Sequence, residues 1–569
     1  MAQVVPDLLR RSAALVPDRP AVILDGQDTL TFAELEARSN AFARGLQQRG
    51  IGHGDRVALE YTGADWPRYV VAYFGVLKLG AVALLTGTRF TEADLARIVS
   101  GYRVAAVVRA RGVTVPAVDC LVLDDESIDA DQPTEEFPIA ATPVDAAEVV
   151  FTSGTTDRPR GVVATHANLV GAQAAWPTAI RANQPCAHAL PLGSVAAQAV
   201  LLTCVGNQHT LLVASQFTVS GFSAMVDKHH AVTVCLVPAM GHWLVRDGAE
   251  QATPMPTVKG VSFSGAPLPT AILPDLPRVF PNASFFNFYT STETYPARLA
   301  TRVDPQRPES VGRPVGTSAV RVTGPDGTEL PPGEVGEVWL RAGGAPPRQL
   351  LDGSPTDVRD GWTRTGDLGY LDADGYLFLT GRSTDIVIVG GINVSTGRVE
   401  QILRRHPAVA EAAVCGVAHP VLGEVLAAFV VARDDVTVRD LRAHAAANLA
   451  RHELPAIIRI ADDLPRNPAG KVVKSELPRL LEVGETPFEA PATPLEQQVA
   501  AVWAEVLDLG TVGRTDNFFD IGGDSLAANQ IAARLRDQLN VALDAVAVFE
   551  APSVAELADY LAPLIGESA

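Results

Sequence analysis

The stretch Thr152-Ser153-Gly154-Thr155-Thr156-Asp157-Arg158-Pro159-Arg160-Gly161 directly follows the apolar run Val149-Val150-Phe151. The run predicts a buried strand, so the polar stretch is expected to be a loop at its end. Hydroxyl groups, glycine-exposed backbone amides and a nearby cation together suit the binding of phosphate oxygens. The stretch lacks the Gly-Lys-Ser/Thr sequence of a Walker A loop, and a solvated turn between strands is the alternative interpretation.

Around this stretch, helix-like and strand-like patterns alternate. Helical patterns open at 31–35 and cover 70–79, and strand-length apolar runs lie at 56–59, 105–108, 120–123 and 148–151. This alternation predicts an α/β fold of layered helices and sheets, with a largely parallel sheet. Short strands with turn signals follow from about residue 318, and a smaller α/β unit extends from Gly390-Gly391 to about residue 482.

The composition narrows the class of protein. With 47% hydrophobic and 20% charged residues, a chain of 569 residues is expected to bury large cores. The 46 basic and 65 acidic residues give a net charge of −19, which argues against a nucleic-acid partner. Neither a long apolar run nor a signal-peptide pattern is found, so we expect a cytoplasmic protein without membrane association. The five cysteines are at least 18 residues apart, which excludes CxxC metal or redox spacing.

The C-terminal region differs from the rest of the chain. Residues 485–494 are rich in proline and threonine, as in a linker. From Pro491 onward there are 12 acidic residues, three arginines and no lysine, spread over four helix-like segments. This region therefore predicts an acidic four-helix module on a linker.

Two further motifs offer groups that suit a nucleotide. In Asn287-Phe288-Tyr289-Thr290-Ser291-Thr292-Glu293, aromatic rings beside a carboxylate can stack a base and coordinate Mg²⁺, although a loop with a core aromatic is the simpler interpretation. In the segments 361–367 and 381–385, Asp367 can accept hydrogen bonds from a ribose diol and Arg382 can pair with phosphate or ribose oxygens. Turn chemistry with a surface ion pair is the alternative for this pair of segments.

Lysine is scarce in this chain. Only five of the 46 basic residues are lysines: Lys78, Lys228, Lys259, Lys471 and Lys474. Lys471 follows proline and glycine in the stretch 465–474, and its compact charge suits a developing pentavalent phosphate. A solvated surface lysine is the alternative interpretation for Lys471, and this alternative carries more weight for Lys474 than for Lys471.

The tail carries the motif Asp516-Asn517-Phe518-Phe519-Asp520-Ile521-Gly522-Gly523-Asp524-Ser525-Leu526. Ser525 is expected at the start of a helix that continues to Leu539, where an attached phosphodiester would meet free N–H groups and the helix dipole. An N-cap serine is the plainer interpretation. A hydrolase nucleophile is disfavoured, because no histidine follows His452 to act as its base.

Taken together and in this order, the segments resemble the adenylate-forming (ANL) superfamily, which includes acyl-CoA synthetases, aryl-acid ligases and peptide-synthetase adenylation domains. The resemblance covers roughly residues 5–482, and the tail from about 495 resembles an acyl or peptidyl carrier protein. It implies an N-terminal core of layered sheets and helices and a small, mobile α/β subdomain, followed by an all-α, four-helix carrier. The implied boundaries are 1–383 for the core, 384–482 for the subdomain, 483–494 for the linker and 495–569 for the carrier.

The resemblance also implies roles for individual residues in forming an acyl-adenylate from ATP. The phosphate-binding loop would comprise Thr152, Ser153, Gly154, Thr155, Thr156 and Arg160. Tyr289 would pack against adenine, with Ser264, Gly265 and Ala266 on the other side and Asn287 in the same motif. Thr292 would bind the α-phosphate, Glu293 would hold Mg²⁺, Asp367 and Arg382 would bind the ribose, and Lys471 would bridge the attacking carboxylate and the α-phosphate.

For the second half-reaction, the resemblance implies a rotation of the small subdomain about Thr384. Gly390 and Gly391 would then line a channel for 4′-phosphopantetheine, which Ser525 would carry and whose thiol would attack the acyl-adenylate. The tether would give the acceptor an effective concentration of order millimolar. A phosphopantetheinyl transferase and a downstream acyl-accepting enzyme are the implied partners, in the biosynthesis of a natural product.

The chain departs from the superfamily pattern at several positions. Asp157 and Arg160 replace the usual glycine and lysine of the phosphate loop, Thr290 replaces a glycine, and the pivot position carries Thr384 instead of the common Asp or Lys. We expect these changes to affect the efficiency of the reaction more than its type.

The expected acid is an acyl or aryl carboxylic acid. Residues 158–226 contain no Asp or Glu that could bind an α-ammonium group, and burying an unpaired ammonium costs several kcal/mol. Pro191, Ser194, Gln198 and Ser264 are expected to lie at the acid, in a mostly apolar pocket. Two alternatives stay open: an amino-acid-activating peptide-synthetase module, and a passive carrier whose adenylation domain is disabled.

Overall fold

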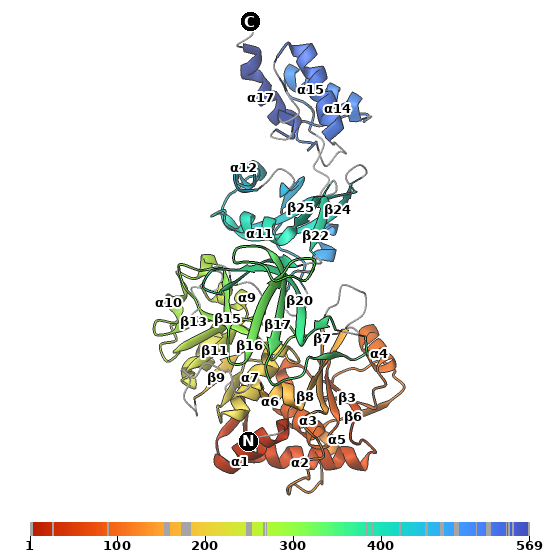
Figure 1. The fold of residues 1–569 in the computed structure, drawn as a ribbon, viewed down its shortest axis with the longest axis vertical. Helices are drawn as coiled ribbons and strands as arrows, with labels where there is room; N and C mark the ends of the chain where they lie inside the picture. Colours follow the sequence, from red (N-terminus) through yellow and green to blue (C-terminus); the bar gives the residue numbers. More distant parts are fainter. Residues whose placement is uncertain are drawn as a thin grey trace. The chain divides into compact units, whose positions relative to one another are not determined.

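The computed structural model describes residues 4–25, 28–87, 90, 92–152, 160–171, 184–245, 253–265, 268, 270–354, 356–382, 385–389, 392–419, 423–449, 453–466, 471–482, 489–507, 509–518, 525–541, 543, 547–548 and 551–566. The chain forms two compact units, residues 1–380 and 381–569 (Figure 1). No helix in the described ranges is long and apolar enough to cross a membrane.

The larger sheet of the first unit has fourteen strands within the described residues, in the order β16-β17-β20-β21-β15-β14-β13-β12-β11-β9-β10-β1-β2, with β19 paired to β20. The strands are β1 (Pro20–Leu24), β2 (Asp28–Thr31), β9 (Cys186–His188), β10 (Leu211–Val213), β11 (Thr233–Leu236), β12 (Gly260–Phe263), β13 (Ser284–Tyr289), β14 (Leu299–Arg302), β15 (Ser310–Pro314), β16 (Ser318–Thr323), β17 (Gly336–Ala342), β19 (Val358–Arg359), β20 (Trp362–Leu371) and β21 (Leu377–Arg382). Neighbouring strands from β1 to β13 along this order are parallel, whereas β13, β14, β15 and β21 pair antiparallel.

The second sheet of this unit has seven strands in the described ranges, in the order β18-β8-β7-β4-β3-β5-β6. They are β3 (Arg56–Glu60), β4 (Val82–Leu85), β5 (Ala106–Arg109), β6 (Leu121–Asp124), β7 (Ala146–Thr152), β8 (Arg160–Thr165) and β18 (Gln349–Leu350). The five strands from β7 to β6 are parallel, and β8 and β18 extend the sheet antiparallel. These strands confirm the sequence-based prediction of a largely parallel sheet.

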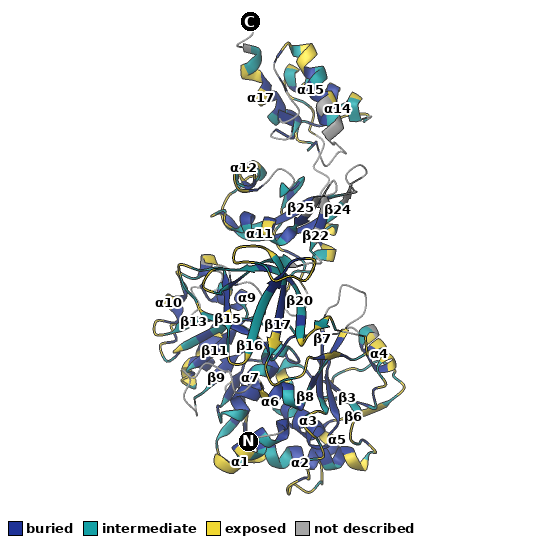
Figure 2. Cartoon of the chain, viewed as in Figure 1, coloured by how far each residue is buried: buried dark blue, intermediate teal, exposed yellow. Residues whose placement is uncertain are grey.

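Helices cover the sheets and bury their apolar faces (Figure 2). They are α1 (Val5–Leu15), α2 (Phe32–Gln48), η1 (Gly63–Asp65), α3 (Trp66–Lys78), α4 (Glu92–Gly101), α5 (Glu126–Asp129), α6 (His166–Gly171), α7 (Val195–Gly206), α8 (Val219–Lys228), α9 (Pro238–Val245), η4 (Thr270–Ile272) and α10 (Leu276–Val279). One core joins α1, α2, α3 and α7 to both sheets, and another joins α8, α9 and α10 to the larger sheet.

Local sequence explains where these helices begin. Thr31 caps α2: its hydroxyl accepts from Glu34 N at 3.2 Å, and the Glu34 carboxylate accepts from Thr31 N at 2.8 Å. This reciprocal pair satisfies N–H groups that have no partner within the helix. The helix predicted to open at Thr31 is therefore confirmed.

The second unit begins with a small α/β subdomain. Its described strands form a sheet in the order β23-β22-β25-β24, with β26 paired to β25. The elements are β22 (Ile386–Val389), β23 (Ile392–Ser395), α11 (Thr396–Arg404), β24 (Val409–His419), β25 (Gly423–Ala432), α12 (Val438–Asn448), β26 (Ile457–Ile460), η6 (Lys474–Glu476) and α13 (Arg479–Glu482).

The C-terminal part of this unit is helical, as the sequence predicts. The helices are α14 (Pro494–Leu507), α15 (Ser525–Leu539) and α17 (Val554–Gly566), and Ala547 and Val548 are also helical. Trp503 and Phe518 meet edge to face, with ring centroids 5.3 Å apart, in a core shared by the three helices.

Candidate active site

Several predicted site residues lie outside the described residues. They are Ser153, Gly154, Thr155, Thr156, Ala266, Thr384, Gly390 and Gly391, together with Asp157. Three more are described by their place in an element and not by their side chains. Thr152 ends β7, Arg382 ends β21 and Ser525 begins α15. The remaining predicted residues can be placed in full.

The segment expected to flank adenine follows a strand end. Phe263, the last residue of β12, pairs with Asn287 of the parallel strand β13. Ser264 and Gly265 therefore leave the sheet beside Phe288 and Tyr289. Gly265 has a φ of +88°, a backbone conformation that L side chains rarely adopt. Carboxyl ends of parallel strands are the usual ligand edge of an open α/β sheet, so this register places two predicted segments at one such edge.

Tyr289 and Asp367 meet directly, although 78 residues separate them. The Tyr289 hydroxyl donates to Asp367 Oδ2 at 2.5 Å, and both residues are less than 10% exposed. Asp367 N donates in turn to the hydroxyl of Thr365 at 3.0 Å. A carboxylate has two oxygens and about four acceptor positions, so Asp367 retains capacity to accept from a diol.

The loop after Tyr289 is fixed by its own side chains. The Thr290 hydroxyl donates to Ala297 O at 2.7 Å, so the departure from glycine at this position has an internal hydrogen-bond partner. Ser291 N donates to the Thr294 hydroxyl at 3.1 Å, and Thr294 N donates to the Ser291 hydroxyl at 3.3 Å. Thr292 and Glu293 lie between these anchors and are half-buried. Asn287 is buried below them and donates to Ser310 O at 3.3 Å, which is a structural contact.

A buried polar network lies beside helix α7, and the sequence analysis missed most of it. Glu148 of β7 is 1% exposed and accepts from the Tyr73 hydroxyl at 2.8 Å and from Gln198 Nε2 at 3.1 Å. Gln198 Oε1 accepts from the Tyr69 hydroxyl at 2.8 Å. Both ends of the Gln198 amide are thus bonded within the protein. An isolated carboxylate inside an apolar strand run was the signal available in the sequence.

Arg348 supplies a positive charge near this network. It is 2% exposed, and its guanidinium lies over the Tyr295 ring at 5.1 Å. None of its three side-chain nitrogens has a hydrogen-bond partner in the described part of the chain. Burial lowers the pKa of Arg348, and the charges of Glu148 and Glu293 oppose this shift. The positive charge of Arg348 is therefore within electrostatic range of the buried Glu148.

The other residues expected at the acid are Ser194, Pro191 and Ser264. The Ser194 hydroxyl accepts from Ala197 N at 3.2 Å and caps α7. Pro191 and Ser264 are half-buried. Nearby, His188 ends β9 and is fully buried, with Nδ1 accepting from Leu190 N at 3.0 Å and the Trp66 ring centroid 5.2 Å away. Burial lowers the pKa of His188 to about 3, so its imidazole is neutral. The polar groups of Ser194 and Gln198 are thus engaged by the protein.

In the second unit, Lys471 is exposed and lies at the end of a loop whose stem is closed. Arg466 and Val472 form an antiparallel bridge, and Val473 N donates to Pro465 O at 2.8 Å. Lys474, three residues further on, forms ion pairs with Asp385 and Glu400. The interpretation of Lys474 as a solvated surface lysine is therefore wrong.

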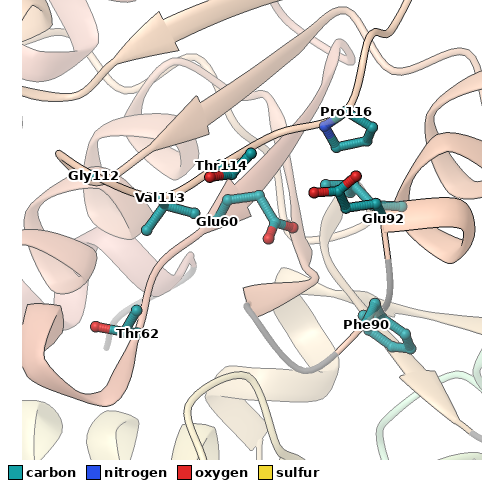
Figure 3. Close-up of a pocket in the computed structure, with 9 residues that line it drawn as sticks. Glu60, Thr62, Phe90, Glu92, Gly112, Val113, Thr114 and Pro116 are labelled. Atoms are coloured by element: carbon teal, nitrogen blue, oxygen red, sulfur yellow. The ribbon is translucent and has the colours of Figure 1, made fainter.

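A separate cavity of about 300 Å³ lies in the first unit (Figure 3). It is lined by Glu60, Thr62, Phe90, Glu92, Leu95, Gly112, Val113, Thr114 and Pro116. The two carboxylates would repel phosphate groups, and none of the predicted site residues is among those that line it. The cavity therefore does not contribute to the nucleotide site.

Comparison with known proteins bears on this geometry. A family model described as AMP-binding enzyme matches residues 9–345, more than half of the chain. The chain belongs to this family. Models described as AMP-binding enzyme C-terminal domain and as phosphopantetheine attachment site match residues 398–471 and 497–561. The chain is thus an adenylation domain followed by a carrier domain, and the predicted fold class is confirmed.

Individual relatives agree with this assignment. The chain is 32% identical to a fatty acid–[acyl-carrier-protein] ligase, ScoC, of Streptomyces coeruleorubidus, over 81% of this chain and 93% of the relative. It is 31% identical to a probable non-canonical nonribosomal peptide synthetase, CymA, of Salinispora arenicola, over 98% of this chain and 7% of that protein. The structure of O-succinylbenzoate coenzyme A synthetase of Bacillus subtilis with ATP and magnesium superposes with a TM-score of 0.73 at 26% identity, covering 83% of this chain and 99% of that one. The chain is therefore a ligase that adenylates an acid and loads it as a thioester onto a carrier.

Proposed function

We propose that this ligase activates an acyl or aryl carboxylic acid with ATP, releases pyrophosphate, and transfers the acyl group to phosphopantetheine on its own Ser525. The buried pair of Tyr289 and Asp367, followed by Thr292 and Glu293, carries the nucleotide part of the proposal. These groups lie on and after strands of one sheet, so they are held in register before any ligand binds.

The proposed roles of individual residues follow the superfamily pattern. Tyr289, Ser264, Gly265 and Ala266 flank adenine, Asp367 and Arg382 bind the ribose, Thr292 binds the α-phosphate, and Thr152, Ser153, Gly154, Thr155, Thr156 and Arg160 bind the outer phosphates. Lys471 bridges the acid carboxylate and the α-phosphate, where its charge offsets the negative charge that develops as the carboxylate attacks. Its exposed position at the end of a closed loop supports a role that requires it to reach another part of the protein.

Two groups that the superfamily uses fit the residues present. Glu293 offers carboxylate oxygens in a fixed loop, which suits Mg²⁺ shared with phosphate oxygens. Bound there, Mg²⁺ would reduce the negative charge on the phosphates. Ser525 begins α15, where a phosphodiester meets the positive end of the helix dipole, and an attached pantetheine arm would supply the accepting thiol.

The choice of a non-amino acid rests on charge. Glu148 is the buried carboxylate next to Gln198, and it already accepts two hydrogen bonds in the electrostatic range of Arg348. An α-ammonium group at this carboxylate would therefore also meet the positive charge of a buried guanidinium. Residues 158–226, where an ammonium-binding aspartate would be expected, contain no acidic residue. An acid without an ammonium group avoids this cost.

The proposed organisation places the adenylation core at 1–383, the mobile subdomain at 384–482 with its pivot at Thr384, the linker at 483–494 and the carrier at 495–569. The division of the structure into 1–380 and 381–569 supports a boundary near the pivot. Gly390 and Gly391 line the proposed pantetheine channel. A phosphopantetheinyl transferase acting on Ser525 and an enzyme that accepts the loaded acyl group are the proposed partners.

Acid-dependent exchange of pyrophosphate into ATP tests this proposal, because it reports adenylation without the carrier. We expect exchange with members of a panel of fatty, aryl and amino acids that lack an α-ammonium group, and equal exchange in Ser525→Ala. Exchange with α-amino acids alone would establish an amino-acid-activating module instead. No exchange with any acid, while Ser525 still accepts phosphopantetheine, would favour a passive carrier.

A further inference from the structure

Lys474 has an unusually complete set of partners for a lysine near the surface. Its Nζ lies 2.8 Å from Asp385 Oδ2, 2.7 Å from Glu400 Oε1 and 2.8 Å from the Thr396 hydroxyl. An ammonium group has three donors and no acceptor, so these three oxygens satisfy it fully. The Lys474 side chain is 28% exposed, while those of Asp385 and Glu400 are 25% and 11% exposed.

Two of the partners of Lys474, Glu400 and Asp385, are themselves held by neighbouring residues. Glu400 Oε1 also accepts from Val414 N of β24 at 2.9 Å, and Glu400 Oε2 lies 3.6 Å from Arg404 Nη1. Thr396 N donates to Asp385 O at 3.0 Å. Burial alone would lower the pKa of Lys474, but the carboxylates of Glu400 and Asp385 outweigh it and raise the pKa. The ammonium is therefore charged at neutral pH and cross-links α11 to the segment before β22.

The cluster of Lys474, Asp385, Glu400 and Thr396 lies next to two residues with proposed roles in adenylation. Asp385 directly follows the proposed pivot at Thr384, and Lys474 lies three residues after Lys471. The two intervening residues are held to the other side of the loop, Val472 by its bridge to Arg466 and Val473 by its bond to Pro465. Lys474 thus links the segment that follows the proposed pivot to the residues that follow Lys471.

We propose that Lys474 is a positioning residue for Lys471: it clamps residues 472–474, which directly follow Lys471, to Asp385, so that Lys471 keeps its position relative to the segment after the pivot. This inference rests on the proposed function, in which Lys471 acts in adenylation and the subdomain turns about Thr384. Without the clamp, two carboxylates would face each other without their cation, and residues 472–474 would lose their charged link to Asp385 and α11.

The variant Lys474→Met tests the clamp, because it removes the charge and keeps most of the side-chain length. We expect the kcat of pyrophosphate exchange to fall at least about tenfold, with the KM for ATP changed less than about threefold, since misplacing a group by about 1 Å can cost 100-fold in rate. Lys474→Arg should recover most of the rate, because a guanidinium can contact the same oxygens. Lys259→Met, a matched change at an exposed lysine, should leave exchange unchanged.

The transfer half-reaction separates positioning from general damage. We expect Lys474→Met to load its phosphopantetheinylated carrier from added acyl-adenylate at a rate close to that of the unchanged protein, because this step does not use Lys471. Equal slowing of adenylation and transfer would mean a merely structural role and would overturn the proposal. If Lys474→Met does not fold, Asp385→Asn is the alternative variant, because Glu400 still holds the lysine. We expect it to lose pyrophosphate exchange in the same way but to a smaller extent.

A double-mutant cycle relates the inference to the proposed function. If Lys474 acts through Lys471, pyrophosphate release in a single turnover should be no slower in Lys471→Ala/Lys474→Met than in Lys471→Ala. Additive losses, or a Lys474→Met protein as active as Lys259→Met, would overturn the clamp. Full activity of Lys471→Ala would instead contradict the proposed role of Lys471.

Discussion

The two halves of the proposed adenylation machinery are held in different ways. In residues 1–380, Tyr289 and Asp367 are buried, lie on strands of one sheet and share a 2.5 Å hydrogen bond. In residues 381–569, Lys471 is exposed, and its loop is held by a backbone bridge and by the ion pairs of Lys474. Sheet register can fix groups that stay in place during the reaction. The proposed function requires Lys471 to move with its subdomain, and a local cluster of charges can move with it.

Asp367→Asn should give the largest effect in the first unit. It keeps the shape of the side chain and its contact with Tyr289 but removes the charge that would receive the ribose hydroxyls. Hydrogen bonds to charged groups contribute about 1.5–3 kcal/mol each, so we expect kcat/KM for ATP to fall roughly 10- to 100-fold. Steady-state exchange at varied ATP measures this. The same substitution at the exposed Asp360 is the control, and equal behaviour of the two variants would remove Asp367 from the nucleotide site.

A second effect is expected in the pH dependence of stability. Burial lowers the pKa of His188 to about 3 and that of His166 to about 4. In the unfolded chain both histidines become protonated below about pH 6.5, whereas in the folded protein they stay neutral to a lower pH. Stability is therefore lost as the pH falls from about 6.5, by about 2 kcal/mol per histidine at pH 5. Denaturant unfolding at pH 7.5 and pH 5 measures the loss.

His188→Asn sharpens this test, because it keeps an acceptor for Leu190 N and removes the titrating ring. We expect the variant to lose less stability between the two pH values than the unchanged protein. An unaltered pH dependence would mean that His188 is not the buried neutral group described above.

The smallest effect is expected in the buried network of the first unit. Tyr69→Phe removes the hydroxyl that donates to Gln198 and leaves the bond from Gln198 to Glu148 in place. The expected loss is about 1 kcal/mol in the free energy of unfolding, with little change in the KM for ATP. Tyr73→Phe should cost more, because it removes a donor to the buried Glu148 carboxylate itself. If Tyr69→Phe lost more unfolding free energy than Tyr73→Phe, the hydrogen bond to Gln198 would contribute more to stability than the one to Glu148.

The features of this molecule that can be predicted from the sequence are those whose interacting residues lie close together along the chain. Tyr289, Glu293 and Asp367 stand out because each lies in a short motif of turn and polar residues, and the strands and helices follow from local patterns. The pairing of Glu148 with Tyr73 and Gln198, and the charge of Arg348 nearby, depends on contacts across long separations. Glu148 stands out locally as a carboxylate within an apolar run, but nothing in its own segment indicates its partners.

Lys474 shows the same limit, whereas the contact of Ser194 is local. Lys474 resembled a surface lysine because its partners, Asp385 and Glu400, lie more than 70 residues earlier in the chain. Ser194 was expected at the acid because it follows Pro191-Leu192, but its hydroxyl caps α7. A serine just before an apolar helical segment is a recognised N-cap signal, so this contact could have been found from the sequence.

The intact mass of the phosphopantetheinylated protein, after incubation with Mg·ATP and a mixed panel of carboxylic acids, tests the central claim most directly. The account predicts a mass increase equal to one acyl or aryl group, which requires ATP and is absent in both Ser525→Ala and Lys471→Ala. A mass increase matching an α-amino acid would contradict the substrate class. No mass increase together with no pyrophosphate release would contradict self-loading by this ligase.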